Sequence, residues 1–272
     1  MNRAICNDIF NGLSFSATCM AAAKYGFQGI EIAPFTLFSD PLTVTEQELQ
    51  EIKTVLQSEG LVCVGFHWLL KFPNGLCLLD SKDDIRKNAW KRLFALADQC
   101  AYLGGKLLVL GSGDQRSYTG YTNAEAKEVF LSELEQFIPC LEKNGVTLLL
   151  EPLPRNRTNF LNTLKEVDSI LKKASSSHVA TIFDFHNTQE ESKPWNVLFR
   201  QYASTIRHIH FNSPSGGLPF CITDSYYATF RAIKESGYKE WISIETFQKE
   251  YNPEAFLLKA KKLLDELEAQ LL

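Results

Sequence analysis

The stretch Lys106–Glu151, KLLVLGSGDQRSYTGYTNAEAKEVFLSELEQFIPCLEKNGVTLLLE, contains one full unit of the pattern that decides the fold. It begins with an apolar run that is typical of a buried strand, followed by a loop that contains glycine. Thr122 and Glu125 have the spacing of a capping box that opens a helix, and Gly145 stands where this helix should stop. A second apolar run, Thr147–Leu150, follows almost at once. The stretch therefore predicts a strand, a helix and a second strand parallel to the first.

The same alternation recurs along the whole chain. Eight runs rich in β-branched and large apolar residues predict strands, at Ala4–Ile9, Gly29–Ile32, Leu61–Phe66, Lys106–Leu110, Thr147–Leu150, Val179–Phe183, His208–Phe211 and Trp241–Ile244. The segments between these runs have helical periodicity, and an amphipathic helix is expected over Pro253–Leu272. A second capping box joins Thr45 to Glu48.

Eight strand and helix pairs without a break in composition predict an α/β protein with a single (β/α)8 TIM barrel. We expect residues 1–272 to form one domain, since barrels of about 250 residues commonly do. An open, doubly wound parallel sheet is the alternative. No glycine-rich nucleotide-binding motif follows any of the predicted strands, which argues against that alternative.

The composition limits the partners of the chain. A formal net charge of −4 disfavours binding to a phosphate backbone, so no nucleic-acid partner is expected. The seven cysteines are odd in number and form no C-x-x-C pair, which is typical of reduced thiols in a cytoplasmic protein. No apolar segment is long enough to span a membrane, and the first residues lack the apolar region of a signal peptide. A soluble cytoplasmic protein without a membrane partner is the expectation.

Acidic and imidazole side chains stand at the ends of the last four predicted strands. In a barrel strand, alternate side chains point inward while the others pack against the helices. The outward set is apolar in these strands, and the inward set ends in Glu151, Asp184, His210 and Glu245. Because active sites of these barrels form at the carboxyl ends of the strands, we expect these four side chains to meet there.

A divalent metal ion would reconcile the charges of this group. Three carboxylates inside a poorly solvated barrel repel one another, and burial raises the pKa of at least one of them unless a cation compensates. Oxygen donors with one imidazole suit Mn²⁺, Mg²⁺ or Co²⁺ better than a structural zinc site built on thiolates. One ion per chain is predicted, with Mn²⁺ first and Mg²⁺, Co²⁺ or Zn²⁺ as alternatives. For a single carboxylate such as Asp184, an ordinary buried ion pair is the competing interpretation.

Four motifs resemble the xylose isomerase-like TIM barrels, a family of sugar isomerases and epimerases that includes the ketose 3-epimerases, such as D-tagatose 3-epimerase, and the hydroxypyruvate isomerases. They are Glu151-Pro-Leu-Pro-Arg155, Phe183-Asp184-Phe-His186-Asn187, His208-Ile-His210-Phe-Asn212 and Ser243-Ile-Glu245-Thr. The resemblance implies that Glu151, Asp184, His210 and Glu245 bind the metal ion, and that Glu151 and Glu245 also act as acid and base. It implies an isomerase or epimerase of a sugar or sugar phosphate that works through a metal-stabilised cis-enediolate, and a homodimer or homotetramer.

The chain departs from the epimerase pattern at three positions. Ketose 3-epimerases typically carry a Glu, a His and an Arg where this chain has Arg157, Asn187 and Gly216. Such residues grip the substrate and tune the acidity of the glutamate, so ketose 3-epimerase specificity is in question. The departures leave open whether the specificity has changed or the activity has been lost.

Candidate substrate-binding residues stand near the strand ends: Glu31, His67, Arg155, Arg157, His186 and Asn187. His67 precedes Trp68, and an imidazole beside an aromatic ring suits a sugar. Arg155 or Arg157 would bind a phosphate or carboxylate, because a guanidinium grips such groups with two hydrogen bonds. A solvated loop charge is the competing interpretation for Arg157.

Other functions share parts of this pattern. A dehydratase or lyase acting on a related polyol or keto-sugar would begin with the same proton abstraction and diverge afterwards. A non-catalytic sugar-binding barrel would keep the fold without turnover. An endonuclease IV-like phosphodiesterase shares the barrel but uses many histidines, and this chain has five. Exchange of a substrate proton with solvent would separate an enzyme from a mere binder.

Overall fold

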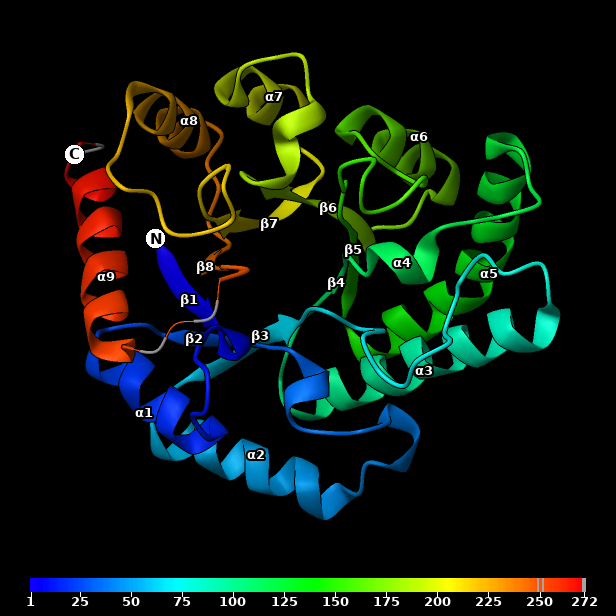
Figure 1. The fold of residues 1–272 in the computed structure, drawn as a ribbon, viewed down its shortest axis with the longest axis horizontal. Helices are drawn as coiled ribbons and strands as arrows, with labels where there is room; N and C mark the ends of the chain where they lie inside the picture. Colours follow the sequence, from blue (N-terminus) through cyan, green and yellow to red (C-terminus); the bar gives the residue numbers. More distant parts are fainter. Residues whose placement is uncertain (249, 251, 271–272) are drawn as a thin grey trace.

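The eight predicted strands close into a parallel barrel in the computed structural model, which describes residues 1–248, 250 and 252–270. Each strand pairs with the next one in the sequence, and the last pairs with the first (Figure 1). The strands are β1 (Asn2–Cys6), β2 (Gly29–Ile32), β3 (Val62–Phe66), β4 (Leu107–Leu110), β5 (Thr147–Leu150), β6 (Val179–Asp184), β7 (Ile206–Phe211) and β8 (Trp241–Ile244). The closed ring confirms the predicted (β/α)8 barrel and excludes the open sheet.

Helices surround the barrel and connect successive strands (Figure 1). They are α1 (Phe15–Lys24), α2 (Glu46–Ser58), α3 (Asp83–Tyr102), α4 (Gly113–Arg116), α5 (Asn123–Asn144), α6 (Leu164–Ala174), α7 (Trp195–Tyr202), α8 (Asp224–Glu235) and α9 (Pro253–Ala269). Short 3-10 helices span Asn7–Ile9, Pro34–Thr36, Pro41–Thr43 and Asn187–Glu190. In the part of the chain that the structure describes, no helix has the length and apolar character needed to cross a membrane. Of the helix expected over Pro253–Leu272, residues 271–272 lie outside the described residues.

Local signals place most element ends where they were predicted. Both capping boxes form, with each threonine side chain accepting the N–H of the glutamate and each glutamate side chain accepting the N–H of the threonine. The first strand is the clearest difference, because it ends at Cys6 instead of Ile9. The Asn7 side chain accepts the N–H of Ala33 at 2.7 Å and donates to the Thr36 hydroxyl at 2.8 Å. These bonds to the segment after β2 hold Asn7 in a 3-10 turn outside the ladder.

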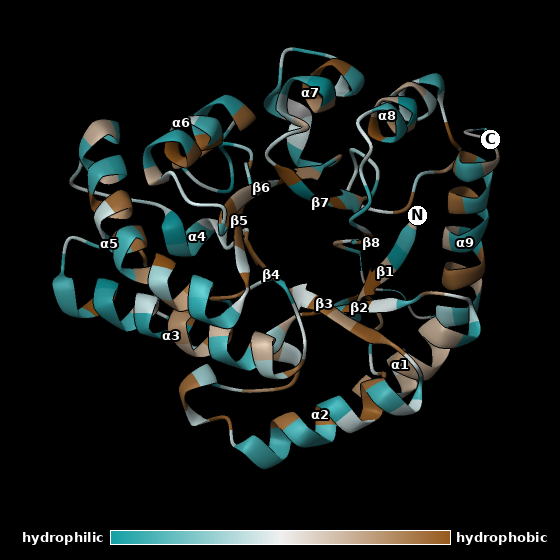
Figure 2. Ribbon diagram, turned by 180° about the vertical axis from the view of Figure 1, so that it is seen from behind, coloured by the Kyte–Doolittle hydropathy of each residue, from teal (hydrophilic) through white to brown (hydrophobic). Residues whose placement is uncertain are grey.

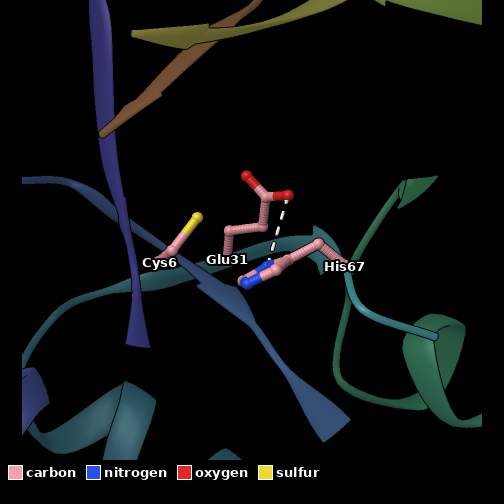
Figure 3. Close-up of side chains that lie close together, drawn as sticks. All are labelled: Cys6, Glu31 and His67. Carbon is pink, nitrogen blue, oxygen red and sulfur yellow. Dashed lines mark ion pairs between the residues drawn. The ribbon is translucent and has the colours of Figure 1, made fainter. Parts of the chain in front are cut away.

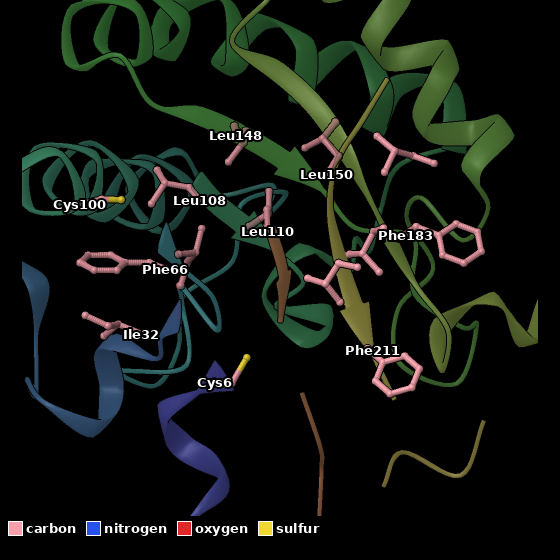
Figure 4. Packing of buried hydrophobic residues seen from close by; sticks show 14 of the residues in the cluster. Cys6, Ile32, Phe66, Cys100, Leu108, Leu110, Leu148, Leu150, Phe183 and Phe211 are labelled. Atoms are coloured by element: carbon pink, nitrogen blue, oxygen red, sulfur yellow. The ribbon is translucent and has the colours of Figure 1, made fainter. Parts of the chain in front are cut away.

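The hydrophobic core has two parts. The larger part lies between the strands and the helices, where Leu108, Leu148 and Phe183 are buried (Figure 4). Figure 2 shows the matching pattern, with hydrophobic strands inside a ring of helices that carry both hydrophilic and hydrophobic residues. The smaller part fills the barrel itself, below the functional site, and includes Leu149 and Ile182. The barrel interior is therefore apolar at one end and polar at the carboxyl ends of the strands.

Gly65 on β3 lets this strand pack closely against β4. A Cβ atom at Gly65 would lie 2.2 Å from the backbone oxygen of Leu107. We expect Gly65→Ala to lower the free energy of unfolding by about 1 to 3 kcal/mol, the range for an overpacked core, as measured by urea denaturation. Gly237→Ala is the control: at φ 74° the added Cβ meets no other group of the described chain, and backbone strain alone costs about 1 kcal/mol. Unchanged stability of Gly65→Ala would contradict this packing argument.

Candidate functional site

The four predicted ligand side chains meet at the carboxyl ends of β5 to β8. Glu151 directly follows β5, Asp184 ends β6, His210 lies on β7 and Glu245 directly follows β8. One ligand atom from each residue lies within 4.8 Å of the others, and all four residues are buried. The sheet register contributes, because Asp184 pairs with His210 and His210 pairs with Ser243. Three carboxylates and an imidazole in this arrangement could hold a divalent cation.

Burial dominates the acid–base properties of this cluster. It raises the pKa of Glu151 well above its usual range, and the charges of Asp184 and Glu245 act in the same direction. Burial also raises the pKa of Glu245. For Asp184, burial acts upward as well, but the nearby His210 outweighs it and lowers the pKa of this carboxyl. The metal-free cluster therefore retains protons that a bound cation would displace.

The turn after β6 orients two of the carboxylates. Asp184 Oδ1 accepts the backbone N–H of His186 at 2.7 Å and that of Asn187 at 3.0 Å. The Asn187 side chain in turn donates to Glu151 Oε1 at 2.9 Å. Asn187, predicted to bind substrate, thus links the carboxylates of β5 and β6 while it also lines the cavity above them.

A buried arginine that no sequence motif marks holds the end of β5. Arg116 is fully buried, and its guanidinium donates to the carbonyl oxygens of Leu110 at 2.8 Å and Glu151 at 2.6 Å. Burial lowers the pKa of Arg116 to about 10, against the attraction of Glu151. Gly111 leaves room for the Glu151 side chain, since a Cβ at this glycine would lie 2.4 Å from Glu151 Oε2. The four-residue helix α4 is too short to show periodicity, so the sequence signals here were Gly111 before it and Gly113 at its start.

A cavity opens above the four ligands at the mouth of the barrel. Of the predicted substrate-binding residues, its lining includes His67, Arg157, His186 and Asn187. The lining also includes residues that were not among the predicted site residues, such as Leu153, Ser215 and Phe247. Glu31 and Arg155 are not among the lining residues in the described part of the chain, so their predicted contact with substrate stays a prediction.

Phe247 forms an aromatic wall of this cavity. Its ring lies 6.3 Å from that of Trp68 and 4.8 Å from that of His186, measured between centroids. Gly216 makes room for it, because a Cβ at this glycine (φ 80°) would lie 2.8 Å from the Phe247 ring. The Phe247 N–H donates to the Gly216 carbonyl at 2.8 Å. A close aromatic contact thus occupies the region where the epimerase pattern has an arginine.

Glu31 lies beneath the ligands and contacts imidazoles instead of the cavity. Its carboxylate, 1% exposed, lies 2.8 Å from Nε2 of His208 and 3.0 Å from Nε2 of His210. His67 approaches the same carboxylate at 3.5 Å, with Cys6 on the neighbouring strand (Figure 3). Burial would raise the pKa of Glu31, but the charges of His210 and His208 outweigh it and lower this pKa well below its usual range.

This contact sets the tautomer of His210. An ionised carboxylate can only accept, so Nε2 of His210 carries the proton that it donates to Glu31. Nδ1 faces Glu245 Oε2 at 3.1 Å. Burial lowers the pKa of His210, but the charges of Glu245 and Glu31 outweigh it and raise this pKa well above its usual range, so Nδ1 also holds a proton until a cation displaces it. A carboxylate that accepts a hydrogen bond from the ring nitrogen facing away from the metal ion commonly orients a histidine ligand in this way. Glu31 therefore prepares His210 to bind a cation through Nδ1.

Comparison with known proteins was consistent with this geometry. The family described as xylose isomerase-like TIM barrel matches residues 19–267. A probable ketose 3-epimerase of Synechocystis sp. is 24% identical over 232 residues, which cover 83% of this chain and 76% of the relative. The 3-dehydro-D-guloside 4-epimerase of Escherichia coli is 22% identical over 239 residues, which cover 82% of this chain and 83% of the relative.

Among solved structures, the D-psicose 3-epimerase of Clostridium cellulolyticum with D-tagatose superimposes with a TM-score of 0.82 at 19% identity, covering 100% of this chain and 99% of that chain. At this level of identity, the structural similarity establishes the fold alone.

Glu31→Gln is expected to weaken binding of Mn²⁺ by about ten- to a hundredfold, the usual effect of removing a support of a metal ligand. An amide is neutral and offers one acceptor oxygen instead of two, so it holds the Nε2 proton of His210 less strongly than an ionised carboxylate does. The measurement is calorimetric titration of metal-free protein with Mn²⁺. Glu128→Gln, at an exposed position on α5, should bind Mn²⁺ like the wild type. Wild-type affinity in Glu31→Gln would show that His210 needs no such support.

Proposed function

The chain belongs to the xylose isomerase-like TIM barrel family, and from this premise we propose that it is a divalent-metal-dependent isomerase or epimerase of a sugar or sugar phosphate. The observation that carries the proposal is the buried cluster of Glu151, Asp184, His210 and Glu245 beneath the cavity. The curated relatives are named epimerases, which are one class of isomerases, and this supports the proposal.

The chemistry of the cluster fits a divalent ion. His210 Nδ1 and Glu245 Oε2 are buried and face each other at 3.1 Å, and neither forms a well-directed hydrogen bond in the described part of the chain. Buried polar atoms without partners are costly, and a cation between them removes that cost. Oxygen donors with one imidazole favour Mn²⁺, with Mg²⁺, Co²⁺ and Zn²⁺ as alternatives. When bound, one such ion per chain supplies Lewis acidity that stabilises negative charge developing on substrate oxygens.

Glu151 and Glu245 are the proposed acid and base. Both line the cavity, and they come from β5 and β8, which are not neighbours in the barrel, so they reach a substrate from different sides. One carboxylate removes the proton beside the substrate carbonyl, which gives an enediolate. The other returns a proton to the opposite face in an epimerisation, or a proton returns to the neighbouring carbon in an isomerisation. Burial raises the pKa of both groups, which suits carboxyls that must carry protons.

The stabilisation of the protein by Mn²⁺ should increase with pH. A carboxyl with a raised pKa in the folded state stabilises that state at low pH, and this contribution is lost as the pH rises through the raised value. In metal-free protein, Glu151 and Glu245 therefore lower the stability of the folded state as the pH rises above about 5. Mn²⁺ would replace their protons and remove this loss of stability. We expect the rise in Tm on adding Mn²⁺ to grow with pH in the wild type and to be absent in Asp184→Ala and His210→Ala. A rise that is independent of pH, or that persists in both variants, would contradict the site.

Glu245→Gln is expected to slow exchange of the substrate proton with solvent by about 10³-fold, within the range for loss of a general acid or base. Deuterium incorporation into a panel of ketoses and ketose phosphates in D₂O, followed by NMR, gives the rate. Metal content is determined on the same samples, and Glu128→Gln is the control. Full exchange in metal-loaded Glu245→Gln would refute the acid–base role. Exchange followed by loss of water would instead identify a dehydratase, and no exchange in the wild type would favour a sugar-binding barrel.

A further inference from the structure

Arg157 is a cation in the wall of the proposed substrate cavity. Its residue is exposed, and it lines the same space as Glu151 and Glu245. Among the residues that the structure describes, no carboxylate forms an ion pair with its guanidinium. The carboxylates in the described lining are Glu151 and Glu245, which belong to the metal-binding cluster. The charge of Arg157 is thus available to a molecule in the cavity.

The neighbouring Arg155 provides an internal comparison. Its guanidinium lies 3.3 Å from a carboxylate oxygen of Glu190 and 3.8 Å from one of Glu166. It also donates to Asn162 Oδ1 at 3.2 Å. Local acidic groups therefore neutralise Arg155, which does not line the cavity. They do not neutralise Arg157, which does. These contacts distinguish Arg155 from Arg157, which the sequence left as equivalent candidates for binding an anionic group.

The backbone around Arg157 is anchored on both sides. Its N–H donates to the Pro154 carbonyl at 2.9 Å. Its own carbonyl oxygen lies so close to Gly113 that a Cβ there would be 2.6 Å away. The next residue, Thr158, is buried, and its hydroxyl accepts a hydrogen bond from Ser117 at 3.1 Å. An exposed side chain on a well-held backbone is suited to a fixed role in binding.

A second cation lies along the same rim. The Lys71 ammonium is 5.4 Å from the centre of the Trp68 ring, and Trp68 lines the cavity. The loop that carries Trp68 is joined to Ser112, whose hydroxyl accepts the Leu70 N–H at 3.3 Å. Ser112 adjoins Gly113, which packs against the Arg157 backbone, so the loops that carry Lys71 and Arg157 are linked through the loop after β4. The base of the cavity, by contrast, carries the cluster of carboxylates.

We infer that the substrate is an anionic sugar, either phosphorylated or carrying a carboxylate, and that Arg157 binds this anionic group at the end remote from the exchanging proton. The inference rests on the proposed function for the position of the reacting carbon. A guanidinium with no protein partner favours such oxyanions, because it can donate two parallel hydrogen bonds to them. A neutral ketose would leave this exposed charge to the solvent alone.

A matched set of ligands tests the inference. D-Fructose, D-fructose 6-phosphate and D-fructuronate carry a hydroxyl, a phosphate and a carboxylate at the same end of the molecule. Calorimetry on Mn²⁺-loaded protein should show that at least one anionic ligand binds about tenfold or more tightly than D-fructose. Arg157→Gln should abolish this preference, Arg157→Lys should keep part of it, and Arg231→Gln, exposed on α8, should keep all of it. The favoured anion distinguishes a sugar phosphate from a sugar acid.

Several results would overturn the inference. They are equal binding of the three ligands by the wild type, a preference that survives in Arg157→Gln, and failure of both anionic ligands to bind. Deuterium exchange on the same ligands is scored separately. Exchange with D-fructose and no preference for charge would refute the inference and leave the proposed function intact. A preference that depends on Arg157, without any exchange, would uphold the anionic ligand and contradict the isomerase.

Discussion

Repulsion among three buried carboxylates is the constraint on which the site depends. Glu151, Asp184 and Glu245 place ligand atoms within 4.8 Å of one another at the dry end of a barrel, where charges interact strongly. The strands cannot turn these side chains outward, because the alternate positions, such as Leu150 and Ile244, are fully buried against the helices. Hydrophobic packing thus enforces an arrangement that electrostatics opposes, and a cation between the carboxylates would relieve their repulsion.

Beneath the ligands, the barrel interior continues in layers. Leu149 and Ile182 form an apolar floor, and the Glu31 carboxylate lies between this floor and His210. A negative group in this layer would be unfavourable without partners, and His208 and His210 supply them. Each layer therefore supports the one above it. Glu31 holds a proton on Nε2 of His210, and Nδ1 faces the side where a cation would bind. The apolar floor keeps water from competing for these bonds.

The barrel and the meeting of Glu151, Asp184, His210 and Glu245 were predictable because they follow from local patterns, namely alternation in the strands and capping signals in the helices. What could not be predicted depends on contacts between distant parts of the chain. The role of Glu31 requires closure of the ring, which brings β2 opposite β7. The Arg116 guanidinium binds backbone carbonyls, which no residue pattern reveals. Arg155 and Arg157 differ because Glu190, in the turn after β6, reaches only one of them.

The rim of the cavity consists of loop residues and its base of residues at strand ends. Residues that could select the substrate are therefore different from those proposed to carry out the reaction. The base consists of side chains at strand ends, held by sheet register and buried packing. The rim consists of loop residues such as Trp68, Arg157 and Phe247, which change without disturbing the strands. The two are coupled through charge, because a base that has lost its protons and holds no cation repels an anion that Arg157 attracts. On the proposed function, a divalent ion that neutralises the base would strengthen the hold of Arg157 on an anionic sugar, so that metal and substrate would bind cooperatively.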